Sequence, residues 1–470
     1  NALYKVIRAS SADALGKHIV VQGGTFLNDA ILRSFEQEIG RNVTRPAISG
    51  LMGAYGAALH AKDNRRETTT LVGTDILAGF EHNVRSTRCG LCENHCNLTI
   101  NDFGGGRRFI SGNRCERPLG GTKKADLPNL YKWKLEKLRS YGEPSGNPNP
   151  IATIGLPFGL NYFELLPFWT KFLRTLGFET VISDVSTRDM YMKGQHSIPS
   201  DTVCYPAKLM HGHIENLLEK GVDAIFYPCM SYNLDEHLGD NHYNCPVVAY
   251  YPEVLEGNCP ELKATKFIYD YFNLERRKDF YGKFAQALDK YFPGLNKKDV
   301  HAAIDAAYDE YHRHMQQLRD KGAEIIATAR KEDRHIIVLA GRPYHVDPEI
   351  NHGINQLIIR QGAAVVSEDS VSCYEQKFQT SVLNQWTYHS RLYAAAKYCT
   401  EQPDMDLVQL VSFGCGLDAV TTDETREILQ AGGKLYTQLK IDEITNLGAV
   451  NIRLRSLFAA LEERKEDHKD

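Results

Sequence analysis

The chain has 470 residues, of which 42% are hydrophobic and 24% charged, so it can form about three globular domains with ordinary cores. Its formal net charge is −4 and it has no long basic block, which argues against a nucleic-acid partner and against binding to a membrane surface. No apolar run is long enough to span a membrane, and no signal peptide opens the chain. Because the cysteines number eleven without a secretory context, we expect reduced, metal-binding thiols in the cytoplasm.

The sequence pattern of residues 1–64 predicts one strand followed by two helices. Residues 18–24 read as a strand that runs into a turn at Gly23 and Gly24, and residues 28–40 and 47–61 have the pattern of helices. A unit of this size is too small to bury a good core alone. We therefore expect it to be a fragment of a larger domain.

Residues 65–150 contain the densest group of cysteines, with the spacing C-x2-C-x3-C-x18-C at Cys89, Cys92, Cys96 and Cys115. A hairpin is predicted before the last cysteine, with strands over 97–101 and 107–111 and a glycine turn between them. Four thiolates brought together in this way can hold a tetrahedral zinc ion or a four-iron cluster. A helix is predicted over 131–141, and residues 142–150 read as a linker.

From residue 151 onward, strands and helices alternate. Strands are predicted over 151–156, 178–183, 223–227, 246–250, 335–340, 363–366, 407–413 and 434–440. This alternation is typical of parallel sheets covered by helices. We expect an α/β fold with two such units, over 151–262 and 335–470, joined by a helical connection over 263–334.

Three cysteines of the α/β units lie at predicted element ends. Cys229 and Cys415 end strands, and Cys204 comes just before a helix, whose N-terminus is expected to lower the pKa of the thiol. Because open α/β sheets bind ligands at the carboxyl ends of their strands, these thiols can converge between the two units. Inert buried thiols are the alternative. The remaining cysteines have no ligand spacing and are expected to be plain thiols: Cys245, Cys259, Cys373 and Cys399.

Two histidines are weaker catalytic candidates. His196 precedes Cys204 by eight residues and could donate a proton near a cluster. His345 and Asp347 follow a predicted strand, and with Arg342 they could bind an acyl-CoA phosphate, a carboxylate or a partner. The alternative is a loop fixed by its two prolines.

The first 64 residues resemble the C-terminal end of the actin/hexokinase-type ATPase domain of 2-hydroxyacyl-CoA dehydratase activators. Residues 21–28 match the adenosine-contacting turn of that family, and residues 53–58 match its closing helix. The resemblance implies that Gly23, Gly24 and Asn28 are the remnant of an ATP site. The phosphate loops of the family lie upstream, so this chain alone should not hydrolyse ATP, which would bind only in a longer protein.

The four-cysteine segment is similar, over about 30 residues, to the N-terminal four-iron module of molybdopterin oxidoreductases. In that family, too, C-x2-C-x3-C is followed by a hairpin and a glycine-flanked cysteine. The similarity implies a 4Fe-4S cluster at Cys89, Cys92, Cys96 and Cys115. A structural zinc ion remains the alternative.

The run Cys204-Tyr205-Pro206-Ala207-Lys208 and the Pro228-Cys229 strand end resemble the subunits of 2-hydroxyacyl-CoA dehydratases. The wider match, over residues 151–461, is to the large domain associated with their activases, with recognisable segments at 341–348 and 412–418. This resemblance implies two flavodoxin-like units that hold a 4Fe-4S cluster. Its ligands would be Cys204, Cys229 and Cys415, with one iron left open.

These features predict an iron–sulfur component of an ATP-driven activator that delivers low-potential electrons to a 2-hydroxyacyl-CoA dehydratase or a similar acyl-CoA enzyme of anaerobic metabolism. One alternative is a reductase that binds a small substrate at the open iron. Another is a zinc-stapled docking scaffold without catalysis. The expected partners are the dehydratase and the upstream part of the ATPase domain, and the sequence also allows a homodimer.

Overall fold

The computed structural model describes residues 15–65, 68, 73–89, 97–113, 127–412, 414–443 and 447–467. The chain divides into two compact units between residues 81 and 82. None of the described helices is long and apolar enough to cross a membrane.

The first unit is built from short helices. They are η2 (Gly24–Leu27), α2 (Asp29–Ile39), η3 (Ser49–Leu51), α3 (Met52–Asp63) and α4 (Thr74–Ala78). The side chain of Asn28 caps α2 by accepting a hydrogen bond from the Ala30 backbone N–H. The strand expected over 18–24 is wrong, because this segment makes only an isolated bridge between Val20 and Thr44. The extended backbone ends at Gly23, whose φ is 98°.

The second unit begins with a small antiparallel sheet in the order β1 (Asn83–Arg88), β2 (Asn97–Asp102), β3 (Arg108–Ser111). The predicted hairpin is confirmed as β2 and β3. Its turn contains Gly104, Gly105 and Gly106, all with positive φ, which residues with a Cβ rarely adopt. The strand β1 was not expected from the sequence.

The first parallel sheet has the order β5-β4-β6-β7, with β4 (Thr153–Leu156), β5 (Glu179–Ile182), β6 (Ala224–Phe226) and β7 (Lys266–Ile268). Its helices are α6 (Tyr162–Thr175), α7 (Arg188–Gly194), η5 (Gln195–Ser197), α8 (Tyr205–Glu219), α9 (Pro246–Asn258) and η6 (Pro260–Ala264). The strand order is the one found in flavodoxin-like sheets, in which ligands bind where the order reverses.

One predicted strand of this unit, over 246–250, is wrong because the segment forms the first turns of α9. Pro246 is at the first helical position, where its missing N–H costs nothing. Val248, Tyr251 and Leu255 are buried at helical spacing. The fourth strand of the sheet is instead β7.

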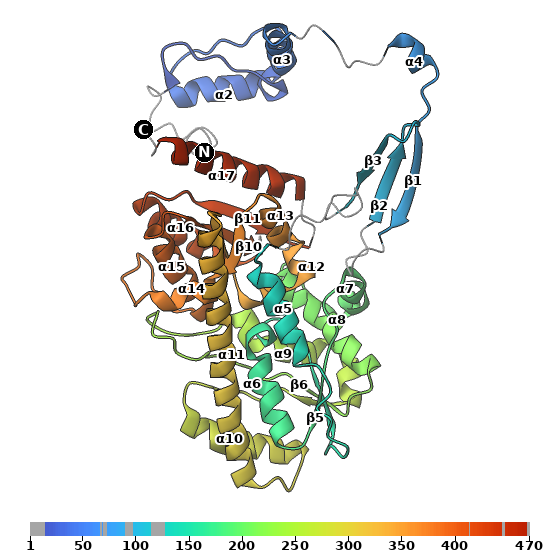
Figure 1. Ribbon diagram of the computed structural model, residues 1–470, viewed down its shortest axis with the longest axis vertical. Coiled ribbons are helices and arrows are strands. Elements are labelled where there is room, and N and C mark those ends of the chain that lie inside the picture. Colours follow the sequence, from blue (N-terminus) through green and yellow to red (C-terminus); the bar gives the residue numbers. More distant parts are fainter. Residues whose placement is uncertain are drawn as a thin grey trace. The chain divides into compact units, whose positions relative to one another are not determined.

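Two helices follow, α10 (Arg277–Tyr291) and the long α11 (Lys297–Lys331). They form most of the helical connection expected over 263–334, but the first part of that range instead contains β7. Figure 1 shows α11 running alongside both α/β units. The helix α5 (Leu130–Ser140) packs against β9 and α11.

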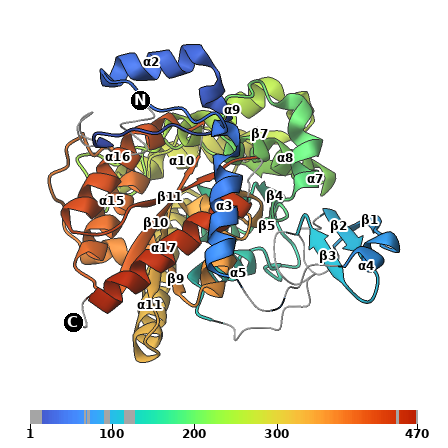
Figure 2. The ribbon, with the colours of Figure 1, turned by 90° about the horizontal axis from the view of Figure 1, so that it is seen from above.

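The second parallel sheet has the order β11-β10-β8-β9, with β8 (Ile336–Ala340), β9 (Ala364–Ser367), β10 (Met405–Ser412) and β11 (Thr437–Ile441). Its helical segments are η7 (Pro343–Val346), α12 (Pro348–Asn351), α13 (Ile354–Arg360), α14 (Glu368–Val371), η8 (Ser372–Tyr374), α15 (Thr387–Thr400), α16 (Gly416–Ala431) and α17 (Leu447–Asp467). Figure 2 shows α15 and α16 on one side of β10 and β11, with α17 on the other.

The two parallel-sheet units confirm the expected α/β fold. The strands β8 and β10 are buried along their whole length, as expected for a sheet covered on both faces. One apolar core contains side chains from both units, including Phe168 and Trp169 of α6 and Tyr344 of η7. This shared core fixes the carboxyl ends of β6, β8 and β10, where the candidate site lies.

Candidate metal centre

Three of the residues singled out from the sequence follow central strands of the two sheets. Cys229 comes after β6, Arg342 after β8 and Cys415 after β10. In each parallel sheet the strand order reverses between the strand that comes first and the strand that comes third along the chain. In the second parallel sheet these two strands are β8 and β10. Such a point leaves room for a ligand at the carboxyl ends.

Three cysteines are the N-caps of long helices. Cys204 caps α8, Cys415 caps α16, and Cys245, which the sequence did not point to, caps α9. All three have an extended backbone before the helix begins. The free N–H groups and the dipole of a helix N-terminus attract negative charge, so each thiol occupies a place that suits a thiolate.

The expectation that the helix N-terminus lowers the pKa of Cys204 is wrong. Burial raises that pKa to about 12, which outweighs the hydrogen bond from the Ala207 backbone. The charges of Cys245 and Cys415 raise it further, while Arg342 opposes them. Burial also raises the pKa of Cys245. Both thiols therefore stay protonated at neutral pH unless a metal displaces the proton.

Arg342 places a buried cation beside these thiols. Its Nη2 donates a hydrogen bond to Sγ of Cys415 at 3.3 Å and pairs with Asp418. Both side chains of that ion pair are about 5% exposed. Asp418 is itself held by the backbone N–H of Ser412, at 2.9 Å. The guanidinium is thus fixed where it can offset the negative charge of thiolates.

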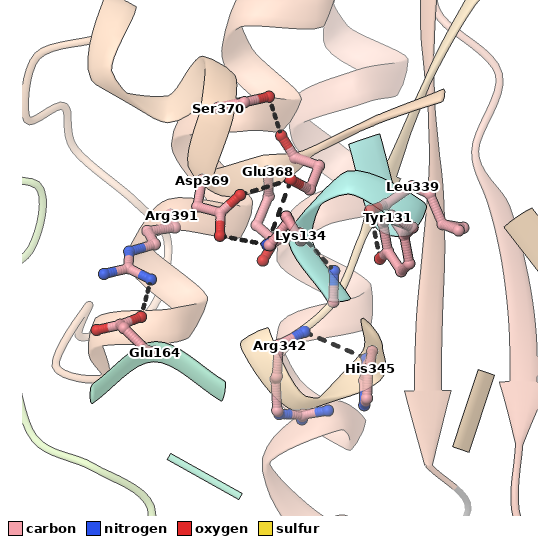
Figure 3. A network of polar contacts seen from close by, with 12 residues as sticks. Tyr131, Lys134, Glu164, Leu339, Arg342, His345, Glu368, Asp369, Ser370 and Arg391 are labelled. Carbon is pink, nitrogen blue, oxygen red and sulfur yellow. Dashed lines mark hydrogen bonds and ion pairs between the residues drawn. The ribbon is translucent and has the colours of Figure 1, made fainter. Parts of the chain in front are cut away.

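Three buried hydrogen-bond donors near Arg342 and the thiols have no partner among the described residues. The backbone N–H of Arg342 donates to Nδ1 of His345 (Figure 3), which leaves the ring hydrogen on the unpartnered Nε2. Nη2 of Arg342 donates to Nε2 of His389, which leaves the unpartnered Nδ1 of that ring as a donor. The third donor is the hydroxyl of Tyr227.

The thiols, the buried cation and the unpartnered donors fit an anionic iron–sulfur cluster. Thiolates are the usual ligands of such clusters, and N–H and O–H groups donate to their sulfurs. Buried donors without an acceptor are costly, and an unseen acceptor would remove that cost. Cys204, Cys245 and Cys415 are not all within 4.8 Å of one another, so they do not surround a single ion. Ligands of a cluster bind different irons and need not be so close.

Cys229 has different surroundings. The residue is fully buried, and its backbone bridges to Tyr271. Burial raises the pKa of its thiol to about 12, and the charges of Glu253 and Asp270 add to this rise, whereas hydrogen bonds with the Glu253 backbone and the Tyr271 side chain oppose it. The structure therefore gives Cys229 carboxylate neighbours, whereas Cys204 and Cys415 have a guanidinium.

The four-cysteine segment lies largely outside the described residues. Cys92, Cys96 and Cys115 are among those not described. Cys89 follows β1 and is buried against Leu98. Zinc or a cluster at this segment stays a prediction.

His196 is exposed beside two carboxylates. Its Nε2 lies 3.7 Å from Glu215 and 3.9 Å from Glu261, and its Nδ1 donates to the Lys193 carbonyl. These carboxylates and the ring are the one group of described side chains whose candidate ligand atoms all lie within 4.8 Å. His196 thus has acidic neighbours, and its role as a proton donor stays a prediction.

Arg342 and Asp347, which begin and end the loop over 342–347, are buried and paired inside the chain. Asp347 is 1% exposed and accepts hydrogen bonds from Ser186 and from the Glu349 backbone, so it joins the second parallel-sheet unit to the first parallel-sheet unit. Asp347 also caps α12, which further fixes the loop. These contacts favour a fixed loop over a phosphate-binding loop.

Burial raises the pKa of Asp347 to about 7, which predicts a specific pH dependence. The folded protein takes up this proton below about pH 7, whereas the unfolded chain does so only near pH 4. Stability from this group is therefore lost as the pH rises between those values. Between pH 5 and pH 8, wild type should lose about 2–3 kcal/mol of unfolding free energy relative to Asp347→Asn. Denaturant unfolding of both proteins at the two pH values measures this, and an unchanged difference would contradict it.

The Gly23–Asn28 segment forms a turn and a helix cap. Gly23 has the positive φ that a residue with a Cβ avoids, Gly24 begins η2, and Asn28 caps α2. This geometry accounts for the residues as local structure. Their role as an ATP-site remnant stays a prediction.

The fold and the site together define an α/β protein with two parallel-sheet units and a group of buried thiols at the strand ends. Residues 153–371, a little under half of the chain, match a family described as "CoA enzyme activase uncharacterised domain (DUF2229)". Residues 153–371 therefore match a CoA enzyme activase domain, and over these residues the match confirms the resemblance to activases of 2-hydroxyacyl-CoA dehydratases.

Other comparisons add little. No curated protein matches the chain significantly. Among solved structures, a similar chain is the C-terminal domain of glucosamine-fructose-6-phosphate aminotransferase from Francisella tularensis, with 10% identity and a TM-score of 0.19. That match covers 70% of this chain and 87% of the other. A TM-score this low supports no structural argument.

Proposed function

We propose that this chain is the iron–sulfur component of an ATP-driven activator that passes low-potential electrons to a 2-hydroxyacyl-CoA dehydratase or a similar acyl-CoA enzyme. The match to a CoA enzyme activase domain supports the activator role. The observation that carries the redox part is the set of thiols at helix N-termini beside buried Arg342 and unpartnered donors. The ATPase part would belong to a longer protein.

Each residue of the site would have a separate role in holding the cluster. Cys204 and Cys415, with a third thiol, would lose their protons and hold the cluster. Arg342 would offset their charge, and Asp418 would keep the guanidinium in place. The buried donors would stabilise the additional negative charge of the reduced form. A bound cluster would supply one-electron chemistry, with a potential set by these hydrogen bonds and by burial.

A small-substrate reductase is less well supported. The hollow beside His345, lined also by Tyr205 and Ser412, has no room for a water molecule. Ligand pockets usually measure roughly 300–1,000 Å³. The described site therefore suits electron transfer better than binding of a substrate at an open iron.

Electron delivery can be followed directly. The anaerobically purified chain is reduced with dithionite, freed of excess reductant and mixed with an oxidised 2-hydroxyacyl-CoA dehydratase. We expect the visible absorbance lost on reduction to return as one electron leaves the chain and reduces the dehydratase. The Cys204→Ala variant, as a control, should show a smaller change. A reduced wild type that stays reduced with the dehydratase would contradict the proposal.

A further inference from the structure

We infer that His196, Glu215 and Glu261 bind a divalent transition-metal ion, of which Zn²⁺ fits the three ligands best. Their candidate ligand atoms all lie within 4.8 Å of one another. His196 lies in η5, Glu215 on α8 and Glu261 in η6, so three elements of the first parallel-sheet unit each supply one ligand. None of the three residues belongs to the thiol site, so the proposed function does not depend on this metal.

The imidazole of His196 is oriented as a metal ligand. Its Nδ1 lies 2.9 Å from the carbonyl oxygen of Lys193, and because a carbonyl can only accept a hydrogen bond, Nδ1 holds a hydrogen. In the neutral ring, Nε2 therefore carries a lone pair, and this atom faces the carboxylates of Glu215 and Glu261. Metal-binding histidines usually donate their other ring N–H to a carbonyl or a carboxylate in this way.

The distances suit a small metal ion better than a hydrogen bond. Nε2 of His196 lies 3.7 Å from Oε1 of Glu215 and 3.9 Å from Oε1 of Glu261, and neither distance is short enough for a hydrogen bond. Zinc lies about 2.0–2.2 Å from nitrogen and oxygen ligands, so two ligands at a tetrahedral angle are about 3.4 Å apart. Small rotations of the two carboxylates would therefore bring the three atoms around the ion.

The two carboxylates have no permanent cation of their own. Among the described residues they form ion pairs with His196 alone, which is charged only when protonated. Oε1 of Glu215 is buried and has no hydrogen-bond partner in the described part of the chain. Lys193 pairs instead with Glu219, at 2.7 Å. Carboxylates this close repel each other, and a dication between them would remove the repulsion and give Glu215 its missing partner.

The elements that carry the three ligands are joined by close packing. A Cβ on Gly194, which ends α7 just before η5, would lie 2.2 Å from the backbone nitrogen of Gly212 on α8. Buried His211 of α8 shares hydrogen bonds with Ser197 of η5, at 2.8 Å, and with Tyr251 of α9, at 3.0 Å. The helix α9 leads directly into η6. The ligands therefore need little ordering when a metal binds, which favours tight binding.

The chemistry of the ligands selects the metal. Imidazole suits zinc and other transition-metal ions, whereas Mg²⁺ and Ca²⁺ prefer oxygen ligands. Three protein ligands leave the fourth position of zinc for a water molecule. The side chains of His196 and Glu261 are 55% and 44% exposed, so water and the ion can reach the site from the solvent.

The test measures zinc bound per chain, in competition with a chromophoric chelator, for the whole anaerobically purified protein. The variants are His196→Ala, Glu215→Gln, Glu261→Gln and, as a matched control, Glu219→Gln. Glu219 lies on the same helix as Glu215 but pairs with Lys193. We expect the first three variants to bind one zinc ion more than about 100-fold more weakly than wild type, and Glu219→Gln to match wild type. Zinc bound by cysteines is the same in all of these proteins.

Two results would overturn the inference. One is equal zinc binding by wild type and all four variants, which would leave the three side chains as an ion pair only. The other is displacement of the zinc from wild type by excess Mg²⁺, which would indicate an unselective acidic surface. Anomalous scattering from wild-type crystals soaked in zinc does not depend on how the variants fold. We expect a peak between His196, Glu215 and Glu261, and a zinc peak at cysteines alone would contradict the site.

Discussion

Replacing Arg391 by alanine should lower the unfolding free energy by about 3–5 kcal/mol, because it leaves a buried carboxylate without its cation. Arg391 on α15 is 1% exposed and pairs with Glu164 of α6 (Figure 3) and, at 2.6 Å, with Glu236. Glu164 is 3% exposed. The pair also joins the two parallel-sheet units, so its loss should weaken both together.

The matched control is Arg330→Ala. Arg330 pairs with Asp404 at 2.7 Å, but its side chain is 42% exposed, and such pairs contribute about 0–1 kcal/mol. Denaturant unfolding followed by the fluorescence of buried Trp169 measures both variants. If Arg391→Ala were no less stable than Arg330→Ala, the structural role of the buried pair would be wrong.

Replacing Lys134 by methionine should also cost about 3–5 kcal/mol. Lys134 on α5 is buried, and its Nζ lies 2.6 Å from Asp369 of α14 (Figure 3). Although burial by itself would raise the pKa of Asp369, the charges of Lys134 and Arg391 lower it. Asp369 is therefore ionised at neutral pH, and removing the ammonium leaves a buried charge without compensation.

A second substitution tests this explanation. In Lys134→Met with Asp369→Asn no charge remains buried, so the double variant should recover part of the stability lost by Lys134→Met alone. The same denaturant experiment measures both. A double variant less stable than the single one would show that packing, and not the unpaired charge, dominates.

The sequence predicted much of the fold because strands and helices of the α/β units have clear periods and ends. The strands β4 to β6 and β8 to β11 lie close to their expected positions. The error at 246–250 arose because Val247 and Val248 favour a strand, whereas Cys245-Pro246 is a helix start. That error also hid Cys245 as the residue that caps α9. The signal that could have found it was a cysteine directly before a proline that begins a helical pattern.

The sequence could not predict which buried charged side chains pair with one another, and the reason is different. Arg391 and Glu164 are 227 residues apart in the chain, and nothing in their local sequence marks them as partners. The same holds for Arg342, whose contacts to Cys415 and Asp418 depend on the packing of β8 beside β10. Periodicity predicts which face of an element is buried, but not which polar groups meet there.

The most direct test of the central claim is an elemental and spectroscopic analysis of the anaerobically purified chain. We expect iron and acid-labile sulfide in wild type, a resonance signal after reduction, and a lower iron and sulfide content in Cys204→Ala. Zinc without iron, or an iron content that Cys204→Ala leaves unchanged, would contradict a redox cluster at the strand ends of the two α/β units.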